Sequence, residues 1–416
     1  MTKELADLTP ITEAQRVFFA AVPAPELEKE ECPLTAALGR VVAEPIVAQV
    51  DVPGFSRSTV DGYAVRARDT FGASAAAPAY LELIGEVAMG QAAAQRLGVG
   101  QAVRIATGGM LPEGADAVVM VEYTAETPDG QVEIRRPAAP LENVIERGED
   151  VRRGQVVLEP GHRLRPQDIG ALAGIGCLSL PVYRRPRVAI IATGDEIVPP
   201  ETEPGPGEVR DINSYSLAAQ VEQEGGVPVR LGIVRDEYEL LHQALQQAVA
   251  ENDMVLISGG SSVGTRDVAA RAINSLGEPG VLIHGVTLKP GKPTILAVAQ
   301  GKPVYGMPGH PVSALVVYRL FVRPVLRRLM GCSRELLPDP YVEAVLTRNV
   351  HSDPGRTEYI RVRLVAAGDE LQAEPVLGAS GLIMTMARAD GLIVVPLGSD
   401  GLEAGSRVRV YPFPGA

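Results

Sequence analysis

The loop from Asp51 to Arg66, DVPGFSRSTVDGYAVR, brings a Pro-Gly turn, several hydroxyl groups and two carboxylates together. Asp61-Gly62 is a turn dipeptide ahead of the apolar residues 63–65, so we expect Asp61 at a sharp corner beside a strand. A carboxylate fixed there can hold a metal ion or accept a proton. A turn aspartate that caps its own backbone has the same sequence, so the loop alone leaves both interpretations open.

Three polar segments follow predicted strands further along the chain. Residues 193–196 (TGDE) follow a strand at 188–192, residues 259–267 (GGSSVGTRD) follow 254–258, and residues 307–313 (MPGHPVS) follow 304–306. In an open α/β sheet, ligands bind outside the carboxyl ends of the strands. The three segments are therefore the places where a ligand site is expected.

The glycine-rich segment after residue 258 is a candidate phosphate cradle. Glycines let successive amides face one anion, and the N-terminus of the following helix adds its positive dipole. The candidate anion-binding residues are Gly259, Gly260, Ser262 and Gly264. The segment is neither a Walker A loop nor a full G-x-G-x-x-G, and a plain tight connection explains it equally well.

The turn Pro308-Gly309-His310-Pro311 places Pro311 at the first position of a predicted helix. The amides of Val312 and Ser313 and the Ser313 hydroxyl can then face an anion. The alternative is simply a well-built helix start.

The segment 289–293, KPGKP, holds two ammonium groups in a stiff frame. Lys289 and Lys292 are separated by a Pro-Gly pair and followed by another proline. Rigid lysines suit oxyanions such as phosphate or molybdate, because little conformational freedom remains to be lost on binding. A solvated lysine pair is the alternative.

Three carboxylates, Glu196, Asp236 and Asp267, come just after predicted strands of the same sheet. Carboxylates beside phosphate-binding amides suit Mg²⁺, which bridges protein and phosphate oxygens. Asp236 can instead be a helix N-cap, and Asp267 can be a first-turn aspartate that answers the helix dipole.

Composition limits the classes of function. The 416 residues suggest about three domains. The net charge of −12 argues against nucleic acid or an anionic membrane surface as the main partner. The three cysteines are widely spaced, which argues against disulfides and structural zinc and fits the cytoplasm. The N-terminus lacks a signal-peptide pattern, and no apolar run is long enough to span a membrane.

The predicted elements change in style along the chain. A first helix is expected from Thr12, capped reciprocally with Gln15. Short strands fill the region up to about residue 150, and a helix covers 166–174. From 188 to 330, strands alternate with helices, which predicts a doubly wound parallel sheet covered on both faces. Short strands return beyond 331. The expected elements of the doubly wound region are strands at 188–192, 227–233, 254–258, 281–286, 294–298 and 304–306 and helices at 213–224, 237–250, 267–276 and 311–330.

Taken together, the chain resembles the molybdopterin molybdenumtransferase family, which includes bacterial MoeA and the E domain of gephyrin. The motifs on which the resemblance depends are the loop at 51–66, RIATGGMLPEGADAVVMVE (104–122), ATGDEIV (192–198), GIVRDE (232–237), SGGSSVGTRD (258–267), KPGKP (289–293) and GMPGHPVSA (306–314). They occur in family order and span nearly the whole chain.

The resemblance implies a multidomain α/β plus β fold and an elongated homodimer. Residues 1–48 plus 148–182 would form an elongated N-terminal helix/strand domain, and 49–147 a mostly β inserted domain. Residues 183–331 would form the doubly wound parallel-sheet molybdopterin-binding domain, and 332–416 a small C-terminal domain resembling a β-barrel.

The implied activity is transfer of molybdenum from molybdate to the dithiolene of adenylylated molybdopterin, assisted by Mg²⁺, with release of AMP. A molybdopterin adenylyltransferase is the implied upstream partner. By position in the motifs, the implied functional residues are Asp61, Thr107, Glu196, Asp236, Asp267, Lys289, Lys292, Pro308 and Pro311. Glu196, Asp236 and Asp267 would face the metal, Asp61 and Thr107 would come from the other subunit, and Arg361 and Ser380 would add molybdate contacts.

Three positions depart from the family pattern: Ser56-Arg57 makes the first loop more positive, His310 replaces the usual Asn, and Ser261 replaces a common Val. Two other functions compete. Related single-domain adenylyltransferases share the GGxSxG loop but lack the other domains, and a scaffold role, as in gephyrin, has no linker or partner domain here to support it.

Overall fold

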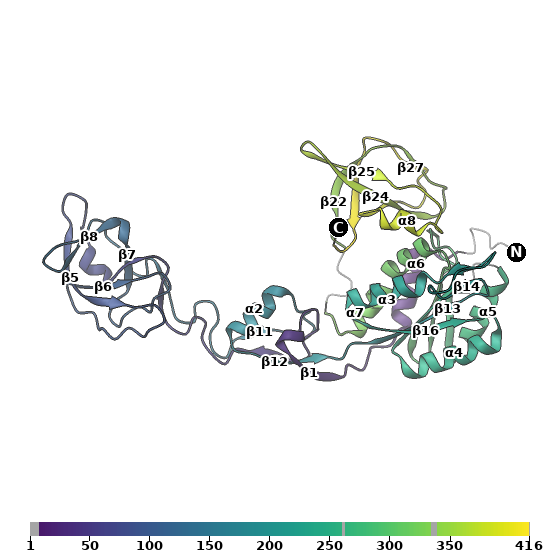
Figure 1. The fold of residues 1–416 in the computed structure, drawn as a ribbon, viewed down its shortest axis with the longest axis horizontal. Coiled ribbons are helices and arrows are strands. Elements are labelled where there is room, and N and C mark those ends of the chain that lie inside the picture. The colour runs from purple at the N-terminus through teal and green to yellow at the C-terminus, as the bar shows by residue number, and fades with distance from the viewer. Residues whose placement is uncertain (1–7, 260–262, 334–338, 416) are drawn as a thin grey trace.

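The computed structural model describes residues 8–259, 263–333 and 339–415. The molecule is elongated (Figure 1). A β domain lies at one end, a small N-terminal domain lies in the middle, and an α/β domain and a C-terminal barrel lie together at the other end. Multiple domains with one doubly wound sheet are what the sequence predicts. The exact domain boundaries stay a prediction.

The N-terminal domain is built on a two-stranded antiparallel ribbon. Strand β1 (Lys29–Pro33) pairs with β12 (Ser179–Tyr183), although about 150 residues separate them in the chain. A second antiparallel pair and a helix complete the domain: β2 (Ile46–Val47), β11 (Val156–Leu158) and α2 (Pro166–Gly174). Helix α2 has the predicted bounds, with Pro166 at its start. A single apolar cluster under these elements forms the domain core.

The β domain is a six-stranded sheet inserted into the N-terminal domain. Its order is β7-β4-β6-β5-β9-β8. The strands are β4 (Gly62–Val65), β5 (Ala79–Val87), β6 (Gln101–Ile105), β7 (Ala117–Met120), β8 (Thr124–Glu126) and β9 (Gln131–Ile134), with β3 (Arg57–Ser58) pairing β10 (Val144–Ile145) at the entrance. Alternate residues of β4 and β7 enter two separate apolar clusters, so both faces of the sheet are covered.

The α/β domain contains a six-stranded sheet of order β16-β13-β17-β21-β20-β18. The strands are β13 (Arg187–Thr193), β16 (Val227–Val234), β17 (Met254–Gly259), β18 (Pro279–His284), β20 (Ile295–Ala299) and β21 (Lys302–Met307). The first four in this order are mutually parallel, as predicted. Strand β20 runs antiparallel to both of its neighbours, β21 and β18, so the prediction of an all-parallel sheet is wrong for this strand. Only Gln300-Gly301, both with positive φ, connect β20 to β21, and a two-residue link joins antiparallel strands.

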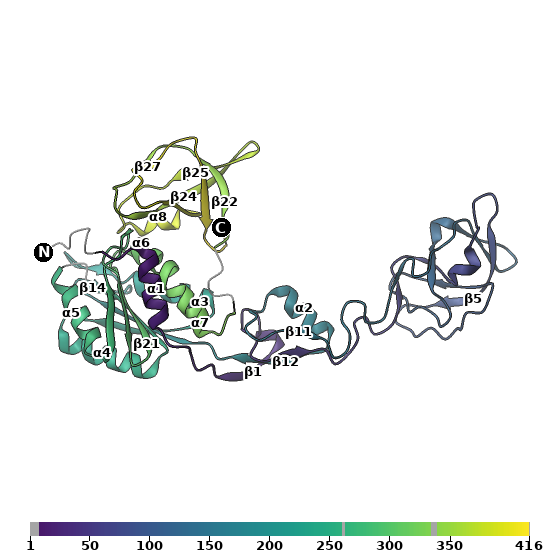
Figure 2. The same ribbon diagram turned by 180° about the vertical axis from the view of Figure 1, so that it is seen from behind.

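Helices cover both faces of this sheet (Figure 2). They are α3 (Asn213–Glu224), α4 (Tyr238–Glu251), α5 (Val263–Asn274), α6 (Pro311–Val317) and α7 (Arg323–Leu329). Val188 and Ile190 of β13 face the cluster under α3, α6 and α7, whereas Ala189 and Ile191 face the cluster under α4 and α5. A π-helical turn (Tyr318–Val322) joins α6 to α7, so the predicted long helix is continuous but not uniformly α-helical.

Helix α1 (Ile11–Ala21) also packs on the α/β sheet. Its Phe18 is fully buried and meets the ring of Tyr305 edge to face, with centroids 5.2 Å apart. The predicted reciprocal cap between Thr12 and Gln15 is wrong. Pro10 is the N-cap residue and makes no side-chain cap, and the Gln15 amide donates instead to the Leu320 carbonyl at 3.0 Å.

The C-terminal barrel closes through two pairings of one strand, since β24 (Thr357–Ala367) pairs with both β25 (Glu370–Pro375) and β26 (Gly391–Val395). The other elements are β22 (Val342–Leu346), β28 (Arg407–Pro412), the pair β23 (Val350–His351) and β27 (Gly401–Leu402), and helix α8 (Ile383–Ala387). The α/β domain contributes β19 (Leu288–Lys289), which adds to the edge of β24. The KPGKP segment thus begins as a strand shared by two domains.

Candidate active site

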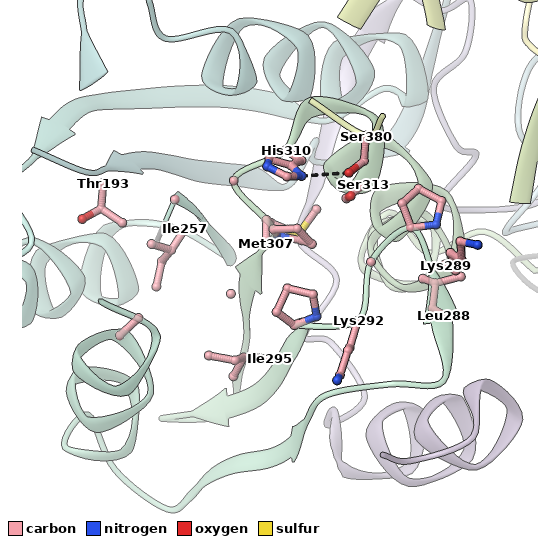
Figure 3. Close-up of a pocket in the computed structure, with 18 of the residues that line it drawn as sticks. Thr193, Ile257, Leu288, Lys289, Lys292, Ile295, Met307, His310, Ser313 and Ser380 are labelled. Carbon is pink, nitrogen blue, oxygen red and sulfur yellow. Dashed lines mark hydrogen bonds between the residues drawn. The ribbon is translucent and has the colours of Figure 1, made fainter. Parts of the chain in front are cut away.

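A cavity of about 500 Å³ opens where the carboxyl ends of β17 and β21 meet the KPGKP segment and the C-terminal barrel (Figure 3). We call it the rim cavity. The predicted residues that line it are Gly259, Lys289, Lys292, Pro308, Ser313 and Ser380. Gly259, Pro308 and Ser313 belong to polar loops that follow parallel strands, which is where the sequence argument expects a ligand site.

Gly259 lies at the point where the strand order reverses, between β13 and β17. Its φ is +155°, and a Cβ added there would lie 1.8 Å from the carbonyl oxygen of Thr193. Only glycine permits this approach of the two strand ends. Gly260 and Ser262, with Ser261, lie outside the described residues, and Gly264 lies in the first turn of α5.

The turn at 308–311 is held from two sides. Asn213 donates to the carbonyl of Gly309 at 2.8 Å and to the Ser258 hydroxyl at 2.7 Å. From the barrel side, His310 Nδ1 lies 2.8 Å from Ser380 Oγ (Figure 3). The departure from Asn to His therefore still provides a side-chain hydrogen bond at this turn.

One predicted donor of this turn is not available to an anion. The amide of Val312 donates to the carbonyl of Ser380 at 3.1 Å, so the prediction that it faces a ligand is wrong. Pro311 begins α6 as predicted and is buried. Ser313 lines the rim cavity and is almost fully buried.

The side chains of the two lysines of KPGKP lie in different surroundings. Their side chains point in different directions (Figure 3). Lys289 Nζ lies 3.1 Å from a carboxylate oxygen of Asp353 and 3.1 Å from one of Glu358, both in the barrel. Burial alone would lower the pKa of Lys289, but these two carboxylates outweigh it and raise the pKa, so the ammonium group stays charged.

Arg356 is a cavity-lining cation that the sequence patterns did not single out. Its Nη2 lies 3.1 Å from Asp353 Oδ2, and its buried Nε has no hydrogen-bond partner among the described residues. A spare buried donor beside a cavity is the kind of group that a ligand oxygen satisfies. The Asp353-Pro354-Gly355 turn just before a strand was the only local signal for this residue.

Arg361 stabilises the backbone segment that carries Ser380. It is buried, and its guanidinium donates to the carbonyls of Val376 at 3.3 Å and Gly378 at 2.7 Å. Burial lowers its pKa. These bonds fix the segment that carries Ser380, and Arg361 itself is not among the residues lining the rim cavity.

The predicted carboxylates lie at the ends of β13 and β16. Thr193 Oγ1 donates to Asp236 Oδ1 at 2.6 Å. Burial, followed by the nearby charges of Glu196 and Asp195, raises the pKa of Asp236 despite that hydrogen bond. The alternative that Asp236 caps α4 is wrong, because Glu237 is the N-cap residue and no side-chain cap is present.

Asp267 lies in the second turn of α5, which begins at Val263, so the first-turn alternative is also wrong; its side chain lies outside the described part of the structure. Within the ranges that the structure describes, no three His, Cys, Asp or Glu side chains are grouped closely enough to hold a metal ion. None of the described helices is long and apolar enough to cross a membrane.

Asp61 and Thr107 form a pair on the β domain. Asp61 Oδ1 accepts hydrogen bonds from the Thr107 amide at 2.7 Å and from its hydroxyl at 2.9 Å. These bonds lower the pKa of Asp61, so the exposed carboxylate is charged at neutral pH. The alternative of a self-capping turn is replaced by this long-range pair. Gly62 is required because a Cβ there would lie 2.0 Å from the Val119 carbonyl oxygen.

The Asp61–Thr107 pair and the rim cavity are far apart in one chain. The β domain that carries the pair and the α/β domain that carries the cavity lie at opposite ends of the molecule (Figure 1). A single chain therefore does not bring the two sets of predicted residues together.

The fold and the cavity define a class of protein: a multidomain chain whose doubly wound domain carries a cavity lined by cationic side chains at its carboxyl rim. Family models match three consecutive stretches: the MoeA N-terminal region (domain I and II) over residues 9–176, a molybdopterin binding domain over 189–328 and the MoeA C-terminal region (domain IV) over 343–413. The chain belongs to the MoeA family of molybdopterin biosynthesis proteins.

Relatives agree over nearly the full length. A molybdopterin molybdenumtransferase of Nostoc is 35% identical over 99% of this chain and 96% of its own length. The enzyme of the same name in Bacillus subtilis is 36% identical over 92% of this chain and 89% of its own length. The crystal structure of the MoeA protein of Pyrococcus horikoshii OT3 covers 98% of this chain and all of that one, with a TM-score of 0.83 at 33% identity.

Proposed function

We propose that the protein is a molybdopterin molybdenumtransferase, which inserts molybdenum from molybdate into the dithiolene of adenylylated molybdopterin and releases AMP. The observation that carries this proposal is the rim cavity, where the KPGKP segment and the turn at 308–311 face each other across the end of a doubly wound sheet. Full-length relatives bear the name of this activity.

The barrel side of the cavity suits a small oxyanion. Lys289 and Arg356 supply positive charge, and the Ser380 hydroxyl, oriented by His310, supplies a neutral polar group. Molybdate is a dianion with four oxygens, which matches donors arranged around a pocket rather than along a groove. Lys292 and Gly259 line the same cavity and would contact the phosphate and pterin parts of the larger substrate.

The carboxylates at the ends of β13 and β16 have the chemistry of a magnesium site. Burial raises the pKa of Asp236, and the nearby charges of Glu196 and Asp195 add to the increase, so a cation beside these carboxylates would favour the ionised form of Asp236. Clustered carboxylates that repel one another are stabilised by a hard divalent cation. We propose that Glu196 and Asp236, with Asp267, would hold Mg²⁺. Bound there, Mg²⁺ would neutralise phosphate charge when the phosphoanhydride bond is cleaved.

The Asp61–Thr107 pair requires a second chain. We propose a homodimer in which the β domain of one subunit brings Asp61 to the rim cavity of the other. The low pKa of Asp61 suits a permanent negative charge better than a general acid, whose pKa should lie near the working pH. Thr107 would orient that charge.

The reaction also implies a supplier. Adenylylated molybdopterin must come from an adenylyl transfer to molybdopterin, so a molybdopterin adenylyltransferase is the proposed upstream partner. The cytoplasm is the proposed compartment, since Cys32, Cys177 and Cys332 form no disulfide within the described part of the chain.

The test is incubation of the purified protein with adenylylated molybdopterin, Mg²⁺ and molybdate. We expect AMP release that depends on molybdate. Consumption of ATP in the presence of free molybdopterin would support an adenylyltransferase instead. If the folded protein catalyses neither reaction, a scaffold role is supported.

A further inference from the structure

A carboxylate of the protein itself, that of Asp353, bridges two cations that line the barrel side of the rim cavity. Asp353 Oδ2 lies 3.1 Å from Lys289 Nζ and 3.1 Å from Arg356 Nη2. Both cations line the cavity. One oxygen held at hydrogen-bond distance by two cationic groups is the arrangement that a bound oxyanion would also adopt.

Asp353 differs from the other carboxylate on Lys289. The Glu358 side chain is only 15% exposed, it belongs to β24, and the Ser352 hydroxyl donates to it at 2.6 Å. The Asp353 side chain is 70% exposed and lies in the loop between β23 and β24. Glu358 is thus a fixed partner of Lys289. The Asp353 side chain can instead rotate into solvent with little loss of stability, because exposed ion pairs contribute little to it.

The remaining donor of Arg356 strengthens the distinction. Its Nε is buried and has no partner in the described chain, so the pair with Asp353 leaves one donor of the guanidinium unused. A guanidinium presents its donors as a fork that matches two oxygens of one anion. A tetrahedral oxyanion can therefore use donors that Asp353 leaves unused.

We propose that Asp353 competes with the oxyanion for Lys289 and Arg356. Asp353 holds these two cations in place before the oxyanion binds, and it must release them when molybdate binds. Asp353 thereby sets the affinity for the oxyanion and favours anions that carry enough charge to displace it. This inference rests on the proposed function in one respect only, the identity of the oxyanion.

The experiment is titration calorimetry of molybdate, in the absence of the pterin substrate, into the full-length protein and into Asp353→Asn. The variant keeps the shape of the side chain and removes its charge. We expect molybdate to bind about two- to fivefold more tightly, the range that corresponds to loss of one exposed ion pair. The matched control is Asp369→Asn, which removes the same charge from the exposed turn between β24 and β25 and should leave the affinity unchanged.

A second readout follows the loop itself. Binding of molybdate to the wild-type chain should increase amide hydrogen exchange in residues 352–356, because Asp353 releases its partners, and the increase should be absent in Asp353→Asn. A general charge effect would tighten both variants and leave the exchange unchanged, which would overturn the inference. Equal affinity of wild type and Asp353→Asn would overturn it as well.

The two proposals fail differently. If molybdate binds more tightly to Asp353→Asn but AMP release does not depend on molybdate, the proposed transferase function is wrong and the competitor role stands. If AMP release depends on molybdate but Asp353→Asn has the same affinity and the same apparent molybdate requirement as wild type, only the competitor role is wrong. If neither chain binds molybdate, the competitor role is wrong, and AMP release decides the transferase function separately.

Discussion

Because Asp61 lies far from the rim cavity of its own chain, two inactive variants should complement each other in a mixed dimer. Asp61→Asn should lower molybdate-dependent AMP release by about 100-fold or more, the usual cost of removing one preorganised charge from a reacting centre. Lys289→Met should be similarly inactive, because it removes a cation from the cavity. Asp61 is exposed and its Oδ1 can still accept from Thr107 as an amide, so the melting temperature should not change.

A mixture of the two variants should regain activity if each site takes Asp61 from one subunit and Lys289 from the other. In a mixed dimer, one site has lost both residues and the other has both intact. Random mixing gives half of all dimers this composition, so about a quarter of the wild-type sites should be restored. If both residues served a site within one chain, every site in the mixture would lack one of them.

The assay is AMP release from equal amounts of the two variants after co-refolding or co-expression, with each variant alone as its control. Size-exclusion chromatography should show dimers in all samples. Thr107→Val, which removes one hydrogen bond to Asp61, should lower the rate by about three- to tenfold. Recovery no greater than either variant alone, or full activity of Asp61→Asn, would refute the proposal that Asp61 acts across subunits.

Three other predictions concern stability. Phe18→Ala should cost about 3–5 kcal/mol in urea denaturation of the α/β domain, because the ring is fully buried against Tyr305; a cost below about 1 kcal/mol would show that α1 is not part of that core. Gly259→Ala should lower the melting temperature and the yield of folded protein, since its Cβ would collide with the Thr193 carbonyl; an unchanged melting curve would contradict the close approach. Asp168→Asn should destabilise the protein by about 1–3 kcal/mol at neutral pH. Burial alone would raise the pKa of Asp168, but hydrogen bonds from Arg165 and His162 hold it well below its ordinary value, so this contribution is present above the ordinary range and is lost as pH falls through the lowered pKa. Denaturation of wild type and variant across that acidic range should therefore converge, and a difference independent of pH would refute the assignment.

The sequence predicted best where local chemistry and topology agree. Strand ends followed by polar loops identified Gly259, Pro308 and Ser313, and the structure places all three on one cavity. Helices α2 and α3 have the predicted bounds, because proline or polar residues at their starts and glycine beyond their ends are local signals.

Other features depend on partners that are distant in the chain. The pairing of Lys289 with Asp353 joins residues 64 positions apart in different domains, and no local pattern marks it. Asp236 has the sequence context of a helix cap, but the strand β13 brings Thr193 close enough to take its carboxylate. The antiparallel direction of β20 follows from a two-residue link at 300–301 that lacks the usual hairpin sequence.

The ribbon formed by β1 and β12 acts as the neck of a lever. Only two strands form this ribbon, and it is held on one side by the core of the N-terminal domain. A small angular change at this neck is multiplied along the arm into a large displacement of the β domain at its tip (Figure 1). In the proposed dimer, the stiffness of a segment that carries no reactive group would therefore decide where Asp61 is placed, and substitutions in the ribbon should alter the reach of the arm without altering the chemistry at either end.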